Sequence, residues 1–180
     1  MYGDTTHCRQ AGFSLIEILV TMVVLSIGLL GVAGMQASGL RNNHAAYTKT
    51  QATNLAMDMA ERIRANPKGQ DNYDGFDTNN TPGTAQTCIS ANTGCNPTDL
   101  AKHDKFEWSQ PIRATNKPIL PGGRGIIQKD LNDIDNQGDD EFVVTILWRE
   151  IAYQDITFNQ CAGIAGQEAD QACFQMRFKP

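Results

Sequence analysis

The longest apolar stretch of the chain lies near its N-terminus, between Gly12 and Leu40. It contains one charged residue, Glu17, and the residues from Ile18 to Leu40 include neither a charge nor a proline. A helix of about 20 apolar residues is long enough to cross the hydrocarbon core of a bilayer. The pattern therefore predicts a membrane-length helix, and a carboxylate at its start needs either a polar partner or water.

Beyond Leu40 the pattern changes from uniformly apolar to one-sided. Apolar residues then fall near helical spacing, namely Leu40, Tyr47, Leu55, Met59 and Ile63. Asp58 and Arg62 are four residues apart and are expected to pair on the solvent-facing side. The Asn-Pro pair after Ala65 should end the helix. Because a one-sided helix must bury its apolar face, we expect this half to pack on a sheet of its own domain.

The next segment, residues 67–98, is rich in Asn, Thr, Gly, Asp and Pro and is predicted to form a long surface loop. A short helix should follow, with Thr98 or Asp99 as its N-cap and Pro111 limiting its length. Trp108 on this helix is expected in the core. The carboxylates of Asp104 and Glu107 have the spacing of a solvated helix face.

The last third of the chain is predicted to be an antiparallel sheet, which makes the fold class α+β. Residues 120–125 have the composition of a turn. Strand patterns occur at residues 125–129, 142–148, 156–158 and 174–178. The second of these segments is apolar on both faces except at Thr145, which is typical of a central strand.

The cysteines indicate an oxidising compartment for the part after the apolar helix. Four of the five cysteines follow that helix, and the fifth, Cys8, precedes it. An even number suits two disulfides, with three possible pairings, of which the local pairs Cys88–Cys95 and Cys161–Cys173 are favoured. A zinc site is the competing interpretation, but neither pair has close CxxC spacing and no histidine lies between them.

Charge and motifs exclude several classes of function. The net charge of −5 over 180 residues, with no basic run, gives no electrostatic case for nucleic acid binding. No catalytic motif is present, so we expect no catalytic residues, no metal and no cofactor. The acidic stretch 129–141 partly fits a calcium loop at Asp133, Asp135 and Gly138, but Gln137 takes a ligand position and Val144 the place of the closing glutamate. The alternative is a solvated turn between two strands.

The residues AGFSLIE, from Ala11 to Glu17, resemble the prepilin peptidase site of type IV pilins and type II secretion pseudopilins. The resemblance implies cleavage between Gly12 and Phe13, N-methylation of Phe13 and a role of Glu17 in assembly. After cleavage the Phe13 amine and the Glu17 carboxylate would be one helical turn apart, so they can neutralise each other within or between subunits. The alternative is that Glu17 stays hydrated at the level of the lipid headgroups.

The resemblance to this family extends beyond the motif. The segments QATNLAMDMAERIRANP, LAKHDKFEW, LPGGRG and VVTILWRE are similar to minor pilins. This implies a cleaved leader at residues 1–12, a transmembrane and filament-core helix at 13–40, an amphipathic continuation at 41–66 and a periplasmic globular domain at 67–180. The implied partners are prepilin peptidase, the inner membrane, other minor pilins and the major pilin. The implied function is incorporation into a pilus, with support of pilus assembly, twitching motility and adhesion.

Two alternatives stay open. A minor pseudopilin of a type II secretion system shares the processing site and the fold. A secreted soluble protein, with a signal peptide cut near residues 37–39, fits less well because the apolar run is longer than that of a signal peptide. The positive-inside rule conflicts with a periplasmic domain. One basic residue, Arg9, precedes the helix while two, Arg41 and Lys49, follow it, and the more basic side is expected in the cytoplasm. The cysteines and the family resemblance favour the periplasmic orientation.

Overall fold

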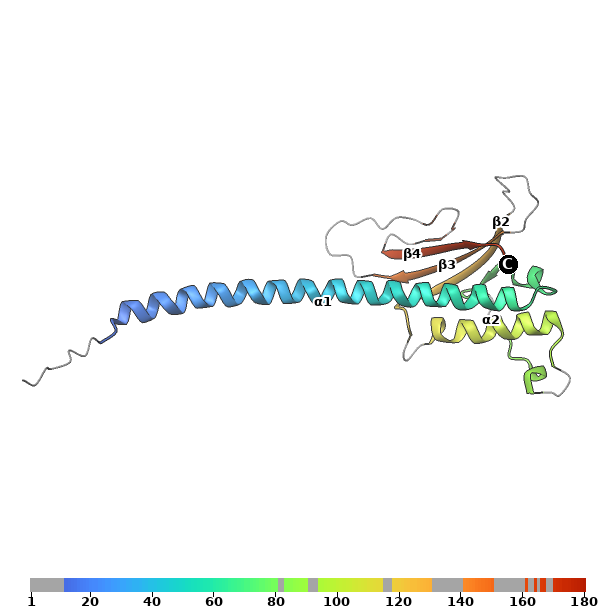
Figure 1. Cartoon of the computed structure of the whole chain (residues 1–180), viewed down its shortest axis with the longest axis horizontal. Helices are drawn as coiled ribbons and strands as arrows, with labels where there is room; N and C mark the ends of the chain where they lie inside the picture. Colours follow the sequence, from blue (N-terminus) through green and yellow to red (C-terminus); the bar gives the residue numbers. More distant parts are fainter. Residues whose placement is uncertain are drawn as a thin grey trace, which may run out of the picture. The chain divides into compact units, whose positions relative to one another are not determined.

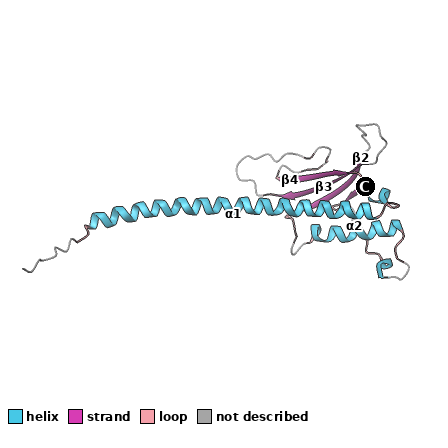
Figure 2. Cartoon of the chain, in the orientation of Figure 1, coloured by secondary structure: helices cyan, strands magenta, loops and turns pink. Residues whose placement is uncertain are grey.

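The structure is a computed structural model that describes residues 12–80, 83–90, 94–114, 118–130, 141–150, 161, 164, 166–167 and 170–180. The chain divides into two compact units, of which the first ends at His44 and the second is Ala45–Pro180. Helices and one antiparallel sheet make up the fold (Figure 2). The predicted α+β class, with a long N-terminal helix packed on an antiparallel sheet, is confirmed.

The long helix α1 (Leu15–Ala65) is continuous over 51 residues. It begins after Ser14, whose carbonyl oxygen accepts the backbone N–H groups of Glu17 and Ile18. The start lies close to the position near Phe13 that the sequence predicts. The helix ends at Ala65, as the following Asn-Pro pair predicts.

Burial along α1 begins only in the second unit. The buried positions recur every three to four residues, and they are Thr48, Ala52, Leu55, Ala56, Met59, Ala60 and Ile63. Leu40 and Tyr47 do not belong to this face, since they are 71% and 59% exposed. Tyr47 is eight residues before Leu55, which places it about 80° around the helix from that side chain. Alanines complete the face instead, because small side chains allow close approach of the helix to its neighbours.

The sheet has four strands in the order β1-β2-β3-β4, and every neighbouring pair is antiparallel. The strands are β1 (Phe76–Asp77), β2 (Arg124–Asp130), β3 (Glu141–Arg149) and β4 (Gln171–Phe178). β3 is buried and lies between β2 and β4, so the predicted central strand is confirmed. The strand expected at residues 156–158 lies outside the described residues.

Within the second unit, α1 lies alongside the sheet and α2 (Pro97–Arg113) (Figure 1). Alternate residues of β3 join the α1 face in one core cluster: Phe142, Val144, Ile146 and Trp148. The other face of β3 carries Thr145 and Leu147, which are also fully buried. Cys173 pairs with Leu147 across the strands, so the Cys161–Cys173 disulfide lies on the face of the sheet that points away from α1.

The described parts of the segment 67–98 contain more secondary structure and more buried residues than the predicted surface loop. It contains η1 (Gln70–Tyr73), β1 and η2 (Thr87–Ser90), and it buries Tyr73, Phe76 and Thr78. The hydroxyl oxygen of Thr78 accepts the backbone N–H of Gly125, which fixes the end of β1 against β2. The composition of this segment is polar, but a few aromatic and hydroxyl side chains are enough to anchor it to the core.

The helix α2 differs from its prediction at both ends. Its N-cap is Asn96, whose side-chain oxygen accepts the Asp99 backbone N–H at 2.9 Å, rather than Thr98 or Asp99. Pro97 then occupies the first turn, where its missing N–H costs nothing. Pro111 lies inside the helix, which continues to Arg113, because a proline so close to the end removes a single hydrogen bond. Trp108 is buried in the core, as predicted.

Candidate assembly site

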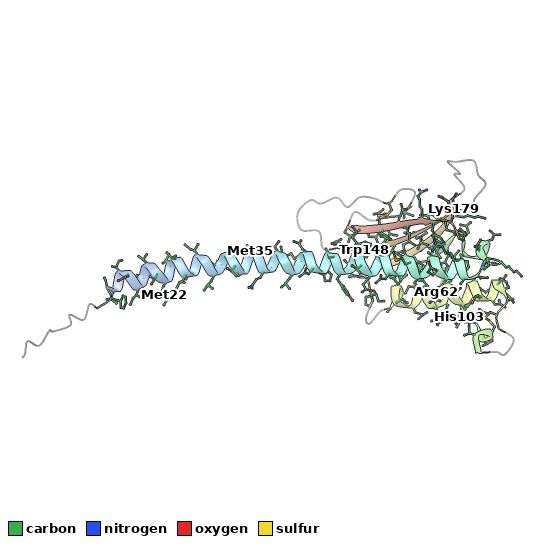
Figure 3. The ribbon with its side chains drawn as sticks, viewed as in Figure 1. Met22, Met35, Arg62, His103, Trp148 and Lys179 are labelled. Carbon is green, nitrogen blue, oxygen red and sulfur yellow. A yellow bond between two sulfur atoms is a disulfide. The ribbon has the colours of Figure 1, made fainter. Side chains whose placement is uncertain are left out.

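The first unit presents an apolar helix that buries none of its surface in the chain. Every residue from Gly12 to His44 is exposed, and Figure 3 shows Met22 and Met35 projecting from this part of α1. By length and composition, α1 is able to cross a membrane. A large apolar side chain gains about 1.5–3 kcal/mol when it is fully buried. So long an apolar surface therefore needs lipid or other apolar helices around it.

The expected processing residues lie at the start of this helix. Gly12 and Phe13 precede α1, and the Phe13 side chain is 82% exposed. Glu17 lies in the first turn, where a carboxylate interacts favourably with the positive end of the helix dipole. The cleavage between Gly12 and Phe13, and the placement of Phe13 and Glu17 on one face after it, stay predictions.

In the second unit, a cluster of polar side chains joins α1, η1 and α2. The carboxylate of Asp104 on α2 accepts a hydrogen bond from the Tyr73 hydroxyl at 2.5 Å and one from Arg62 Nη1 at 3.1 Å. Arg62 also pairs with Asp58, as predicted from their spacing. The prediction that Asp104 lies on a solvated helix face is therefore wrong, since only 10% of its side chain is exposed. Burial raises the pKa of Tyr73, and the hydrogen bond to Asp104 raises it further.

A second polar contact joins β1 to β2. Arg124 Nη2 lies 2.6 Å from Asp77 Oδ2, and both side chains are largely buried, with 16% and 10% exposed. The Asp77 carboxylate also accepts the backbone N–H of Asn79 at 2.9 Å. Burial acts to raise the pKa of Asp77, but the hydrogen bond from Arg124 and that from Asn79 outweigh it, so the pKa is lowered. This contact holds the short first strand on the sheet.

Two disulfides cross-link the globular unit. They join Cys88 to Cys95 and Cys161 to Cys173, which are the two local pairs that the sequence favours. Within the part of the chain that the structure describes, no three His, Cys, Asp or Glu side chains form a metal-binding group. Most of the acidic stretch 129–141 lies outside that part. Val144, in the place of the closing calcium ligand, is fully buried in β3.

Sequence reasoning located the apolar helix, Glu17 and the cysteines, but it missed the cluster around Asp104. A carboxylate is normally assigned to the solvent side of a helix. The available signal was that Leu100, Asp104 and Trp108 share one face, with Trp108 in the core. A charged residue on the same face as a buried tryptophan needs a buried partner, which Arg62 supplies from α1.

Two family models match the chain. The prokaryotic N-terminal methylation motif matches residues 7–33, and a family described as type IV pilin Tt1218-like matches residues 34–106. No curated protein and no solved structure matches the chain. The first matched range contains the predicted cleavage site and Glu17, and the second runs from the apolar helix into α2. Pilin families are structural proteins rather than enzymes. Together with the exposed apolar helix and the antiparallel sheet, these matches identify the chain as a type IV pilin-like prepilin, and the methylation motif implies processing by prepilin peptidase and assembly with other pilins.

Proposed function

We propose that the chain is a minor pilin of a type IV pilus and that it resembles the pilus-modification protein PilV. The observation that carries the proposal is the exposed apolar surface of α1 from Leu15 to Leu40, which lies largely within the match to the methylation motif. The chain is inserted in the inner membrane with residues 67–180 in the periplasm. Prepilin peptidase cuts it between Gly12 and Phe13, and the new Phe13 amine is N-methylated. The helix then leaves the bilayer for the filament.

Glu17 guides this transfer. A carboxylate inside a bilayer costs at least about 2–3 kcal/mol, so it gains from any cationic partner in the same layer. The Phe13 amine, freed by cleavage, is a cation at the same end of the same helix. Pairing of Glu17 with the amine of a neighbouring subunit would draw an incoming helix into register with the filament.

As a minor pilin, the protein acts with other minor pilins and the major pilin through its N-terminal helix. Its place is in the priming complex at the filament tip, where it supports pilus assembly, twitching motility and adhesion. The similarity of several segments to minor pilins supports this role. Two disulfides suit a domain that functions outside the cytoplasm.

The first experiment determines the mature N-terminus by mass spectrometry of the protein from membranes and from sheared pili. A chain that starts at N-methylated Phe13 is the expected result. A chain that starts near Leu40 would have lost both the apolar helix and Glu17, and it would refute the proposal in favour of a secreted soluble protein.

The second experiment separates a pilus from a secretion system. A deletion strain is complemented with the wild-type chain, with Glu17→Gln and with Glu61→Gln, an exposed glutamate of the second unit. Glutamine has nearly the shape of glutamate and can make the same hydrogen bonds in the first turn of a helix, so Glu17→Gln tests the charge alone. We expect loss of surface pili and twitching in the deletion and in Glu17→Gln, and full rescue by Glu61→Gln. Loss of type II secretion with intact pili would show a pseudopilin instead.

A further inference from the structure

The strand β2 has a long neighbour on one side and a very short one on the other. β3 pairs with every residue of β2 from Arg124 to Asp130. β1 pairs with β2 only through Phe76 and Asp77. An uncovered strand edge presents backbone N–H and C=O groups that can pair with a strand of another chain. With β1 as its only cover, β2 would present such an edge over most of its length.

Side chains on both flanks of β1 close this edge. Alternate residues of a strand direct their backbone groups to the same neighbour. Three residues of β2 face β1 in this way, and they are Gly125, Ile127 and Lys129. Ile127 pairs with Phe76 in the ladder. The Gly125 N–H donates to the Thr78 hydroxyl oxygen at 2.9 Å, and the Lys129 N–H donates to Asp74 Oδ1 at 2.7 Å. All three positions are thus covered, although β1 has only two residues.

The segment 74–78 therefore forms an edge cover, and contacts with the rest of the second unit hold it in place. Phe76 is 4% exposed and belongs to the core cluster. Thr78 is fully buried, and its backbone N–H donates to the Gly125 carbonyl oxygen at 3.0 Å. Arg124 Nη2 on β2 lies 2.6 Å from Asp77 Oδ2. The edge cover is therefore a fixed part of the fold.

The strand beneath this cover is complementary to a second copy of itself. Its sequence, from Arg124 to Asp130, is RGIIQKD. When two copies of this strand are placed antiparallel about Ile127, residues 125 and 129 fall opposite each other, and their backbone groups face across the pair. In the same register, Arg124 of one copy falls opposite Asp130 of the other. Opposite charges at directly opposed positions stabilise a strand pair, and the two-fold symmetry repeats this pair at both ends.

We propose that the edge cover prevents two copies of this chain from pairing through β2. Within one chain, Asp77 pairs with Arg124. In a pair of chains, Asp130 of the second copy would take the place of Asp77, and the second β2 would take the place of Asp74, Phe76 and Thr78. The edge cover thus keeps contacts between copies away from the sheet. This inference concerns the sheet alone and does not depend on the role proposed for α1.

The test opens the edge and measures association of the full-length chain by sedimentation equilibrium in density-matched detergent micelles. The wild type supplies the baseline for association through α1. Asp74→Ala removes the acceptor of the Lys129 N–H at an exposed position, so it leaves the core intact. A triple variant combines it with Asp77→Ala and Thr78→Val. We expect the dimer association constant to rise roughly three- to tenfold in the single variant and roughly a hundredfold in the triple variant, because each lost contact corresponds to one hydrogen bond.

Asp71→Ala is the matched control. Asp71 is also exposed and also contacts Lys129, but it accepts from the side-chain Nζ at 2.9 Å rather than from the backbone N–H. Its dimer association constant should equal that of the wild type. Charge reversal then identifies the surface. In the triple variant, Asp130→Lys puts a lysine opposite Arg124 and should return association to the baseline, and a further Arg124→Asp should restore the dimer.

Urea unfolding of each variant reports whether the second unit stays folded, and the single variant decides the question if the triple variant does not fold. Baseline association of a folded Asp74→Ala variant would overturn the proposal. So would a rise in the triple variant that persists after Asp130→Lys, because the copies would then associate through a surface other than β2.

Discussion

The indole nitrogen of Trp108 on α2 donates a hydrogen bond to the carbonyl oxygen of Leu55 on α1 at 2.8 Å, across 53 residues of sequence. Trp148 on β3 is buried to nearly the same degree, with 3% exposed against 1% for Trp108. Its Nε1, however, has no hydrogen-bond partner within the described part of the chain. The two buried tryptophans are therefore matched in burial and differ in whether the N–H has a hydrogen-bond partner among the described residues.

Replacing each tryptophan by phenylalanine should separate the hydrogen bond from the packing. Both variants lose ring volume, but Trp108→Phe also leaves the Leu55 carbonyl oxygen without its donor, while Trp148→Phe removes a donor that has no partner in the part of the chain that the structure describes. We expect Trp108→Phe to lower the free energy of unfolding by about 1–3 kcal/mol more than Trp148→Phe does. Urea unfolding of the chain in micelles, followed by near-ultraviolet circular dichroism, measures the difference. Equal losses would contradict the assignment.

The polar cluster predicts a pH-dependent effect of Tyr73→Phe. At pH 7 the variant leaves a buried Asp104 oxygen without its donor, which should cost about 1–3 kcal/mol in the free energy of unfolding. The pKa of Tyr73 is raised above its ordinary value by burial and by Asp104. This contribution is fully present below the pKa of an unfolded tyrosine, about 10, and is lost as the pH rises toward the folded value. The wild type and Tyr73→Phe should therefore converge in alkaline urea titrations.

Tyr47→Phe is the matched control for this prediction, because Tyr47 is 59% exposed. Its free energy of unfolding should differ from that of the wild type by less than about 0.5 kcal/mol at every pH. A Tyr73→Phe variant that behaved like this control would show that the contact with Asp104 contributes nothing to stability.

The sequence predicts those parts of the fold in which one physical effect dominates. The apolar run, the Asn-Pro pair after Ala65 and the strand at 142–148 follow from burial and backbone sterics alone, and the structure has each of them. The N-cap of α2 is harder to predict, because Asn96, Thr98 and Asp99 are all good N-cap residues. Pro97 favours Asn96 only if it is known to lie in the first turn of the helix. Local pattern cannot distinguish such neighbours.

The parts that sequence did not predict depend on contacts between distant segments. Asp104 is buried because Tyr73 and Arg62, 31 and 42 residues earlier, both donate to it. The face of α1 is completed by alanines, whose role depends on how closely the sheet approaches. The cleavage site and Glu17 are a different case. Their function lies in a peptidase and in other subunits, so the fold of one chain does not test it.

The contact between Asp77 and Arg124 predicts an acid-dependent loss of stability. The pKa of Asp77 is lowered in the folded chain by Arg124 and Asn79 against the effect of burial. A depressed carboxyl pKa stabilises the fold above the unfolded value, about 3.9, and this stabilisation is lost as the pH falls toward the folded value. Asp77→Asn should cost about 1–3 kcal/mol in the free energy of unfolding at pH 7, and the difference from the wild type should shrink below about pH 4.

Asp71→Asn is the control for this acid dependence. Asp71 also pairs with a cation, since Lys129 Nζ lies 2.9 Å from its Oδ1, but its side chain is 87% exposed. Exposed ion pairs contribute about 0–1 kcal/mol, so Asp71→Asn should unfold at nearly the wild-type urea concentration at pH 7 and at pH 3. If Asp77→Asn matched this control at pH 7, burial of the Asp77 pair would have no energetic effect.

The position of Gly125 on β2 has no space for even one added methyl group, because the ring of Trp108 lies against it. A Cβ atom at this position would be 2.4 Å from Cη2 and 2.7 Å from Cζ3 of Trp108. Gly125→Ala should therefore lower the free energy of unfolding by about 1–3 kcal/mol through overpacking. Phenylalanine lacks the outer ring of tryptophan, so the same substitution should cost less in a Trp108→Phe background. A double-mutant cycle by urea unfolding measures this coupling. Additive effects of the two substitutions would show that the strain at Gly125 comes from the backbone of β2 rather than from Trp108.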